Sequence, residues 1–194
     1  MSGANTTRLA NLHDVELAAL AAAGDRAAFG ELVRRHGSAV RGLLRRMGSA
    51  PAEADDVAQD AFLTAFERIR EFRGEGAFAA WVKKIAARLY LRRLQRERRL
   101  AGLAQEAEDA AIDAHQPDAA GRIDLDEGLK SLGAAERLCV SMCYGAGLSH
   151  AETAEALNLP LGTVKSHVKR GLEKLRTRLA PPAGAVFEGK QGNG

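Results

Sequence analysis

The 194-residue sequence has few of the residues that build β-sheet cores and disulfide frameworks. Aromatic residues make up only 5% of the chain and there are only two cysteines. No alternating run of Val, Ile and Thr bounded by turn residues occurs, which disfavours strands. The cysteines, Cys139 and Cys143, lie four residues apart within one expected helix. They are too few for a disulfide framework, and this indicates a reducing compartment, the cytoplasm.

Long hydrophobic runs are also absent. No apolar stretch approaches the roughly 18 residues that a membrane-spanning helix needs. The N-terminal segment has no continuous apolar run leading to a cleavage site. We therefore expect neither a transmembrane helix nor a signal peptide, and no membrane insertion.

Residue patterns that would support catalysis or metal binding are missing as well. The histidines do not cluster, Cys139 and Cys143 lack a second pair of ligands at zinc spacing, and Gly189-Lys190 lacks the glycines of a phosphate-binding loop. The sequence predicts no enzyme, no catalytic residues, no cofactor and no metal site. We interpret the two cysteines as small buried residues, and a redox role for them stays open.

What the chain does contain is helix-forming sequence, rich in Ala, Leu, Arg and Glu, with its apolar residues at helical spacing. The predicted fold is all-α, with two small helical domains joined by a flexible acidic linker. The domains are expected over residues 12–100 and 124–179, with the linker at residues 101–123. A disordered leader is expected over residues 1–11, and a disordered Pro/Gly-rich tail over residues 180–194.

Three long helices are predicted in the first domain. Apolar residues at helical spacing after Asp25 indicate the first of them. Ser49 is a candidate cap, and Pro51 a first-turn residue, for the second helix over residues 52–70. A third helix is predicted over residues 77–100. Its inner face is marked by Phe78, Trp81, Val82, Ile85 and Leu89.

Charge is distributed unevenly, although the formal net charge is only +3. Residues 83–99 carry eight Lys/Arg against one Glu, and residues 165–178 carry six Lys/Arg against one Glu. Between them, residues 106–127 carry eight acidic residues against one Arg. The order is more informative than the sum, because a cluster of one sign attracts a partner of the other.

The most specific motif is a helix-turn-helix pattern over residues 147–179. Ser149 and Glu152 have the spacing of a capping box, and a turn at Asn158 to Pro160 precedes a long basic helix. The positions predicted to face inward are Ala151, Ala154 and Leu157 on the first helix and Val164, Val168, Leu172 and Leu175 on the second.

The opposite face of the long helix carries side chains suited to a DNA surface, because Lys and Arg neutralise phosphate while Arg, Ser and Thr reach base edges. The residues predicted to contact DNA are Thr163, Lys165, Ser166, His167, Lys169 and Arg170. The alternative, a solvated charged face on an ordinary helical hairpin, is less favoured.

The basic helix over residues 83–99 is less specific by itself. Its arginines spread round the helix, which is also typical of a solvated end. The glycine loop at residues 72–76 and the nearby Phe72, Phe78 and Trp81 favour a single-stranded nucleic-acid surface, since bases stack on aromatic rings. Phe78 and Trp81 also fit the core stripe, and for Trp81 the core is preferred.

An acidic cluster lies at the start of the second long helix, formed by Asp55, Asp56, Gln59 and Asp60. A favourable interaction with the helix dipole explains it as well as a docking face for a basic partner does. The residues alone leave the two interpretations equal.

Four segments in order over residues 17–179 resemble the extracytoplasmic-function sigma factors of the sigma-70 family. GDRAAFGELVRRH, AEADDVAQDAFLTAF and EFRGEGAFAAWVKKIAARL are similar to region 2, and GLSHAETAEALNLPLGTVKSHVKRGLEKLR is similar to region 4. The resemblance implies a non-catalytic subunit that binds core RNA polymerase at the β′ clamp helices and the β flap. It would recognise −10 and −35 promoter elements and direct transcription initiation of a stress or signal regulon. An anti-sigma factor is the implied regulator.

The resemblance also assigns residues to these surfaces. Core polymerase binding is implied for Asp56, Gln59, Asp60 and Phe62. Contacts to the −10 element are implied for the loop and the basic helix, through Arg73, Lys83, Lys84, Arg88 and Arg92. Contacts to the −35 element are implied for residues 163–170.

Two departures from the family pattern bear on DNA contacts. Arg88 and Arg92 stand where the family commonly has Asn and Asp, so individual −10 base contacts are not assigned. His167 stands where the family often has Arg, and a neutral His weakens a phosphate or guanine contact.

An alternative class is a helix-turn-helix transcription regulator of the response-regulator output type, since GTVKSH at residues 162–167 resembles that class too. Residues 12–100 count against it, because they show only helical periods, whereas a phosphoacceptor domain alternates strands and helices.

Overall fold

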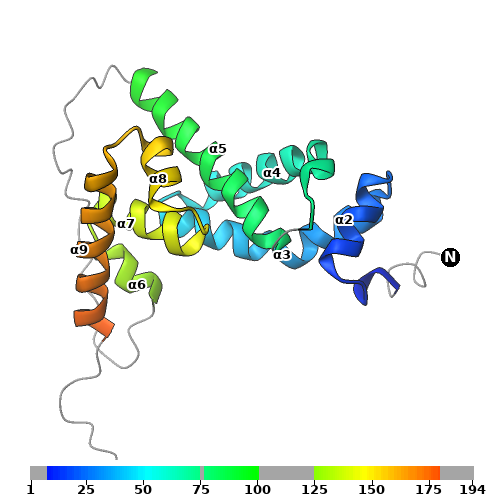
Figure 1. Cartoon of the computed structure of the whole chain (residues 1–194), viewed down its shortest axis with the longest axis horizontal. Coiled ribbons are helices and arrows are strands. Elements are labelled where there is room, and N and C mark those ends of the chain that lie inside the picture. The colour runs from blue at the N-terminus through cyan, green and yellow to red at the C-terminus, as the bar shows by residue number, and fades with distance from the viewer. Residues whose placement is uncertain (1–7, 75–76, 101–124, 180–194) are drawn as a thin grey trace, which may run out of the picture.

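The computed structural model describes residues 8–74, 77–100 and 125–179, and within these ranges every regular element is a helix (Figure 1). The predicted all-α class is therefore confirmed, as is its division into two helical units. The first unit contains α2 (Asp14–Ala22), α3 (Arg26–Met47), α4 (Pro51–Glu67), the short 3-10 helix η1 (Ile69–Glu71) and α5 (Phe78–Leu100). The second contains α6 (Leu125–Lys130), α7 (Ala134–Val140), the π-helical turn η2 (Ser141–Gly145), α8 (His150–Leu157) and α9 (Leu161–Leu179).

Some predicted segments lie wholly or partly outside the described residues. They are the tail, the linker and most of the leader. No helix in the described part of the chain is long and apolar enough to cross a membrane.

Local signals account for the ends of α3. The Asp25 carboxylate accepts hydrogen bonds from the amides of Ala27 and Ala28 at 2.9 and 3.1 Å, which satisfies two free donors of the first turn. Gly48 ends the helix with a φ of 113°, a left-handed conformation that costs glycine little.

The predicted cap of the next helix is wrong by one residue. Ala50 is the N-cap of α4, with no side-chain cap bond, and Pro51 occupies the first turn as expected. Ser49 instead donates from its hydroxyl to Glu53 Oε2 at 2.8 Å. The Ser49 hydroxyl is thus bonded to a side chain four residues away and does not cap the free amides of the first turn.

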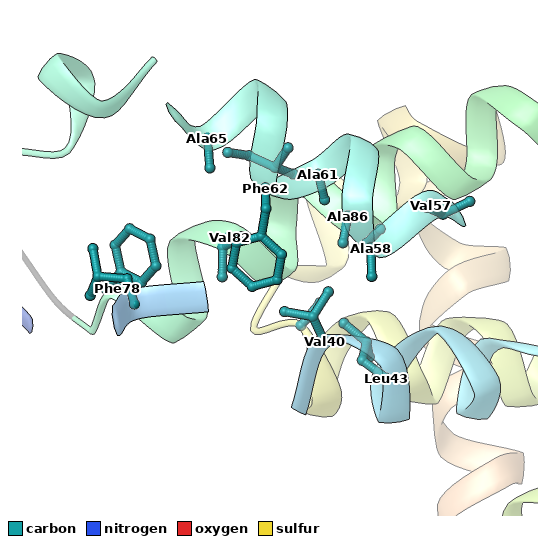
Figure 2. Close-up of a cluster of buried hydrophobic side chains, with 14 of the residues drawn as sticks. Val40, Leu43, Val57, Ala58, Ala61, Phe62, Ala65, Phe78, Val82 and Ala86 are labelled. Carbon is teal, nitrogen blue, oxygen red and sulfur yellow. The ribbon is translucent and has the colours of Figure 1, made fainter. Parts of the chain in front are cut away.

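The core of the first unit lies where α3, α4 and α5 meet (Figure 2). Val40 and Leu43 of α3 face Ala58 and Phe62 of α4, and Val82 of α5 is fully buried beside them. The alanines of α4 leave room for close helix packing: Ala54, Ala58, Ala61 and Ala65 are all buried. Burial of each larger apolar side chain contributes about 1.5–3 kcal/mol.

The N-terminal end of the described chain is held against α3 by one arginine. Arg35 donates to the carbonyl oxygens of Leu9, Ala10 and Leu12 at 3.2, 2.7 and 2.8 Å. Leu9 is also buried in the core. Within the leader expected to be disordered, the part from Arg8 onward is therefore anchored.

The second unit has two small apolar clusters along α9. Leu175 packs with Leu129, Leu132 and Val140. Val164 and Val168 pack with Cys139 and Ala154. A Cβ on Gly171 would lie 2.8 Å from Val140 Cγ2, so the absence of a side chain there lets α7 approach α9 closely.

The two units pack against each other, which the sequence did not predict. Met142, Ala146 and Leu148 of the second unit belong to the same buried cluster as Leu43 and Leu44 of α3. Two polar contacts accompany this packing: Arg46 Nε pairs with Asp126 Oδ1 at 2.6 Å, and the buried Ser141 hydroxyl donates to the Arg46 carbonyl at 3.3 Å. The apolar centre makes the contact a continuation of the core.

Candidate nucleic-acid interfaces

The helix-turn-helix has the predicted capping box and turn. Ser149 Oγ accepts from the Glu152 amide at 3.1 Å, while Glu152 Oε2 accepts from the Ser149 amide at 2.8 Å. Asn158 ends α8 with a φ of 53° and a ψ of 45°, a left-handed conformation that Asn tolerates better than most residues. The capping box thus fixes the start of α8, and the left-handed Asn158 ends that helix before α9 begins at Leu161.

The buried face of α8 differs in part from the prediction. Ala154 is buried and Leu157 half-buried, but Ala151 is exposed. Thr153 is the fully buried residue instead, and its hydroxyl lies 3.4 Å from Cys143 Sγ. Helical periodicity did not predict Thr153 as a buried residue, because a buried threonine hydroxyl needs a hydrogen-bond partner that only the fold reveals.

The predicted DNA face of α9 points away from the cluster that buries Val164 and Val168. Lys165, Ser166, Lys169 and Arg170 are exposed, and Thr163 and His167 are half-buried. All six predicted residues therefore lie on one accessible side of the helix. A straight α-helix with such a face has the width to enter the major groove.

Arg170 is held by neighbours on this face. Its terminal nitrogen lies 3.1 Å from His167 Nδ1, and its Nε lies 3.8 Å from Glu136 Oε1 of α7. Glu136 also accepts from Lys174 Nζ at 2.7 and 3.0 Å. The sequence reasoning missed Glu136, which no motif marks and which lies 38 residues from Lys174.

The two cysteines lie behind the helix-turn-helix. Burial raises the pKa of Cys139 to about 11 and raises that of Cys143 as well. Both therefore stay as thiols at neutral pH, and Cys139 packs with apolar residues. Among the described residues no three His, Cys, Asp or Glu side chains gather in a way that could hold a metal ion.

The second cationic surface lies on α5, and part of it is in contact with α8 (Figure 1). Glu152 Oε1 lies 3.4 Å from Lys84 Nζ and 3.7 Å from Arg88. Arg92 is exposed, and its Nε donates to the Arg88 carbonyl at 3.4 Å. Lys83 is half-buried. The structure thus brings Lys84 and Arg88 together around one carboxylate of the other unit.

Near the N-terminal end of α5, three aromatic rings form a cluster. The rings of Phe72 and Trp81 lie 5.5 Å apart and those of Phe78 and Trp81 lie 5.8 Å apart. Phe78 is buried, whereas Trp81 and Phe72 are half-buried. Trp81 therefore belongs to the edge of the core and keeps an accessible part. Arg73, which follows Phe72 in the sequence, is exposed. Residues 75–76 of the predicted glycine loop lie outside the described part.

A groove of about 530 Å³ runs between α3 and α4. The residues that line it are Arg26, Phe29, Val33, Arg41, Asp55, Ala58, Gln59, Phe62, Leu63 and Phe66. Of the predicted polymerase contacts, Gln59 and Phe62 line the groove, while Asp56 and Asp60 are exposed on α4. Phe62 itself is only 6% exposed.

Leu63 and Arg41 were not predicted for this surface. Leu63 is 56% exposed although it is a large apolar residue, and such a residue beside a groove is typical of a docking site. Arg41 of α3 pairs with Asp55 across the groove at 3.5 Å. The position of Leu63 next to the acidic cluster was the signal that could have identified it.

Comparison with known proteins assigns the family. The model of Sigma-70 region 2 matches residues 32–100, and that of Sigma-70, region 4 matches residues 128–177. The RNA polymerase sigma factor NccH of Alcaligenes xylosoxydans xylosoxydans is 33% identical over 86% of this chain and 94% of that protein. The ECF RNA polymerase sigma factor SigM of Mycobacterium tuberculosis is 33% identical over 91% of this chain and 87% of that protein.

A solved structure agrees with these relatives. CnrH, in complex with the cytosolic domain of CnrY, has 28% sequence identity and a TM-score of 0.51, with coverage of 86% of this chain and 96% of that chain. The chain therefore belongs to the sigma-70 family of RNA polymerase sigma factors, which are transcription initiation factors. Within that family it belongs to the extracytoplasmic-function group, as the resemblance predicted.

The family match also decides against the response-regulator alternative. Residues 32–100 match region 2, and the described part of that range contains helices and no strands. A phosphoacceptor domain needs both.

Proposed function

We propose that this sigma factor reads a two-part promoter with two faces and docks on core RNA polymerase with a third. Helix α9 contacts the −35 element through Thr163, Lys165, Ser166, His167, Lys169 and Arg170. The observation that carries this proposal is that all six side chains lie on the accessible side of α9, opposite its buried stripe. Cations on that face neutralise phosphates, and Arg170 reads a base edge.

The −10 element is contacted by α5 and the loop before it. Lys83, Lys84, Arg88 and Arg92 track the phosphates, together with Arg73. The accessible part of Trp81 offers a ring on which an unpaired base stacks. Lys84, Arg88 and Arg92 recur every four residues on α5, which gives a single strand one row of cations to follow along the helix.

Core RNA polymerase is bound by the face of α4. Asp56, Gln59 and Asp60 supply polar contacts, and the groove holding Phe62 and Leu63 accepts apolar side chains from the β′ clamp helices. The second domain additionally contacts the β flap. The boundaries proposed for the two domains are residues 12–100 and 124–179, and the protein acts in the cytoplasm, where polymerase and promoters are found.

The relative CnrH is solved in complex with the cytosolic domain of CnrY. By analogy, this chain is held inactive by an anti-sigma factor that covers the polymerase-binding face and is released by a signal. Release then starts transcription of a stress or signal regulon.

Run-off transcription tests the proposal directly. Core polymerase is incubated on genomic promoter fragments with and without the full-length protein, and transcripts that require it are mapped. New start sites with shared −10 and −35 sequences are expected. A protein that binds core polymerase yet adds no start site would refute the promoter-reading role.

A further inference from the structure

Glu136 is a buried acidic residue on α7, and the helix-turn-helix motif does not require an acid at this position. Its side chain is 11% exposed, although it lies on α7 next to the cationic helix α9. The carboxylate accepts two hydrogen bonds from Lys174 and lies 3.8 Å from Arg170 Nε. It therefore joins two cations that lie one helical turn apart.

The approach of α7 depends on Gly171, which lies between these two cations in the sequence. A Cβ on Gly171 would lie 3.6 Å from Glu136 Cβ and 2.8 Å from Val140 Cγ2. A larger residue would push α7 away from α9 and take the carboxylate out of reach of both cations. The contacts of Glu136 with Arg170 and Lys174 thus depend on the glycine at position 171.

Two neighbours lie against the Arg170 guanidinium, one through an ion pair and one through a hydrogen bond. Glu136 lies at its Nε, and His167 Nδ1 lies 3.1 Å from its terminal nitrogen. The Arg170 side chain nevertheless stays 57% exposed. A guanidinium carries five N–H donors in a rigid plane, so donors remain free while its orientation is restrained.

We propose that Glu136 is a specificity-determining positioning residue for −35 recognition, acting through Arg170 with His167 as the second support. This inference rests on the proposed function of α9. An unrestrained arginine neutralises whichever phosphate is nearest, whereas a restrained one presents its donors in a fixed direction to a base edge. The carboxylate also subtracts charge from the face, and this lowers attraction to DNA of any sequence.

Removal of the Glu136 charge should therefore raise affinity for DNA of any sequence and lower discrimination between base pairs. Glu136→Gln keeps the shape of the side chain and removes its charge. It is expected to bind non-promoter DNA more tightly, with a steeper dependence on salt. At the same time, it should discriminate less between the correct and the substituted base pair at the position that Arg170 reads. Wild-type discrimination there is expected to be about tenfold or more.

Glu173→Gln is the matched control. Glu173 is 56% exposed on α9 and lies 4.0 Å from Lys169, so its replacement removes the same charge from the same face without touching Arg170. This control is expected to raise non-specific affinity and to leave base discrimination unchanged. The thermal midpoint of each variant is measured first, so that only folded proteins are compared.

The deciding experiment measures binding of holoenzyme to promoters with each −35 base pair substituted in turn, for wild type, Glu136→Gln, Arg170→Ala and the double variant. Glu136→Gln should flatten the profile at the same base pair as Arg170→Ala, and it should have no further effect on discrimination when Arg170 is already alanine. A uniform loss at all positions, or a flattened profile that persists independently of Arg170, would overturn the inference.

The same data separate this inference from the function on which it rests. If wild type shows no preference for any −35 base pair, the proposed role of α9 fails. If wild type discriminates and Arg170→Ala abolishes that discrimination while Glu136→Gln retains it, only the role of Glu136 fails.

Discussion

Glu152 of α8 and Lys84 of α5 face each other at 3.4 Å across the contact between the two units. The hydrogen bond from the Ser149 amide, together with the Lys84 ammonium, lowers the pKa of Glu152, so the carboxylate is charged at neutral pH. Lys84 and Arg88 are proposed contacts to promoter phosphates. Under that proposal, promoter phosphates compete with the Glu152 carboxylate for the same two cations.

Glu152→Gln is therefore expected to strengthen binding of a single-stranded −10 oligonucleotide by about two- to fivefold, the size of a partly exposed ion pair. Glutamine still serves in a capping box, so α8 keeps its N-terminal cap. Fluorescence anisotropy with the isolated protein at two salt concentrations measures the change. Glu155→Gln, on an exposed position of the same helix, is the control. An equal gain for both variants would mean that net charge alone is responsible.

Asp60→Arg is expected to lower affinity for core polymerase by about tenfold or more, since a reversed charge repels a basic partner surface. Asp60 is exposed on the face of α4 that carries the groove residues Gln59 and Leu63. Glu67→Arg makes the same change at the exposed C-terminal residue of α4, about two turns beyond Asp60, and should have a smaller effect. Competition with a labelled sigma factor for core polymerase provides the measurement, and equal losses for the two variants would contradict the proposed docking face.

Arg170→Ala is expected to weaken binding of holoenzyme to the promoter by about tenfold, because a base-reading arginine contributes about 1–3 kcal/mol. Core binding should change little, since Arg170 lies on the proposed DNA face of α9 and outside the face of α4 that is proposed to dock on the polymerase. Arg176→Ala, at another exposed position of α9, is the control and should cost less. A parallel loss of promoter and core binding would count against a −35 role.

Glu31 supplies a prediction about stability and pH. Hydrogen bonds from Arg34 and Arg35 lower its pKa from 4.5 to about 2. Because the folded pKa lies below the unfolded one, the stabilisation is complete above about pH 5 and is lost as the pH falls toward 2. Urea unfolding should therefore find Glu31→Gln less stable than wild type at pH 7, with the difference shrinking between pH 5 and pH 2. A difference independent of pH would assign the effect to packing alone.

Much of the local structure was predictable from the residues. Asp25 and Gly48 mark the ends of α3, and the capping box of Ser149 and Glu152 starts α8, because these signals act over two to four residues. The errors were also local. Ser49 bonds to Glu53 instead of capping α4, and Thr153 is buried in place of Ala151. In both cases a contact with one particular side chain decides the outcome, and helical periodicity does not reveal that contact.

The sequence by itself determined the helical class, the helix-turn-helix with its cationic face, and the resemblance to sigma factors, because helical periodicity and caps are written in neighbouring residues. Only the tertiary structure decided that Glu152 meets Lys84, that Glu136 supports Arg170, and that Leu63 lies beside an open groove. The first two contacts join residues 68 and 34 positions apart. No local pattern specifies such pairs, because they form only when apolar burial brings whole helices together.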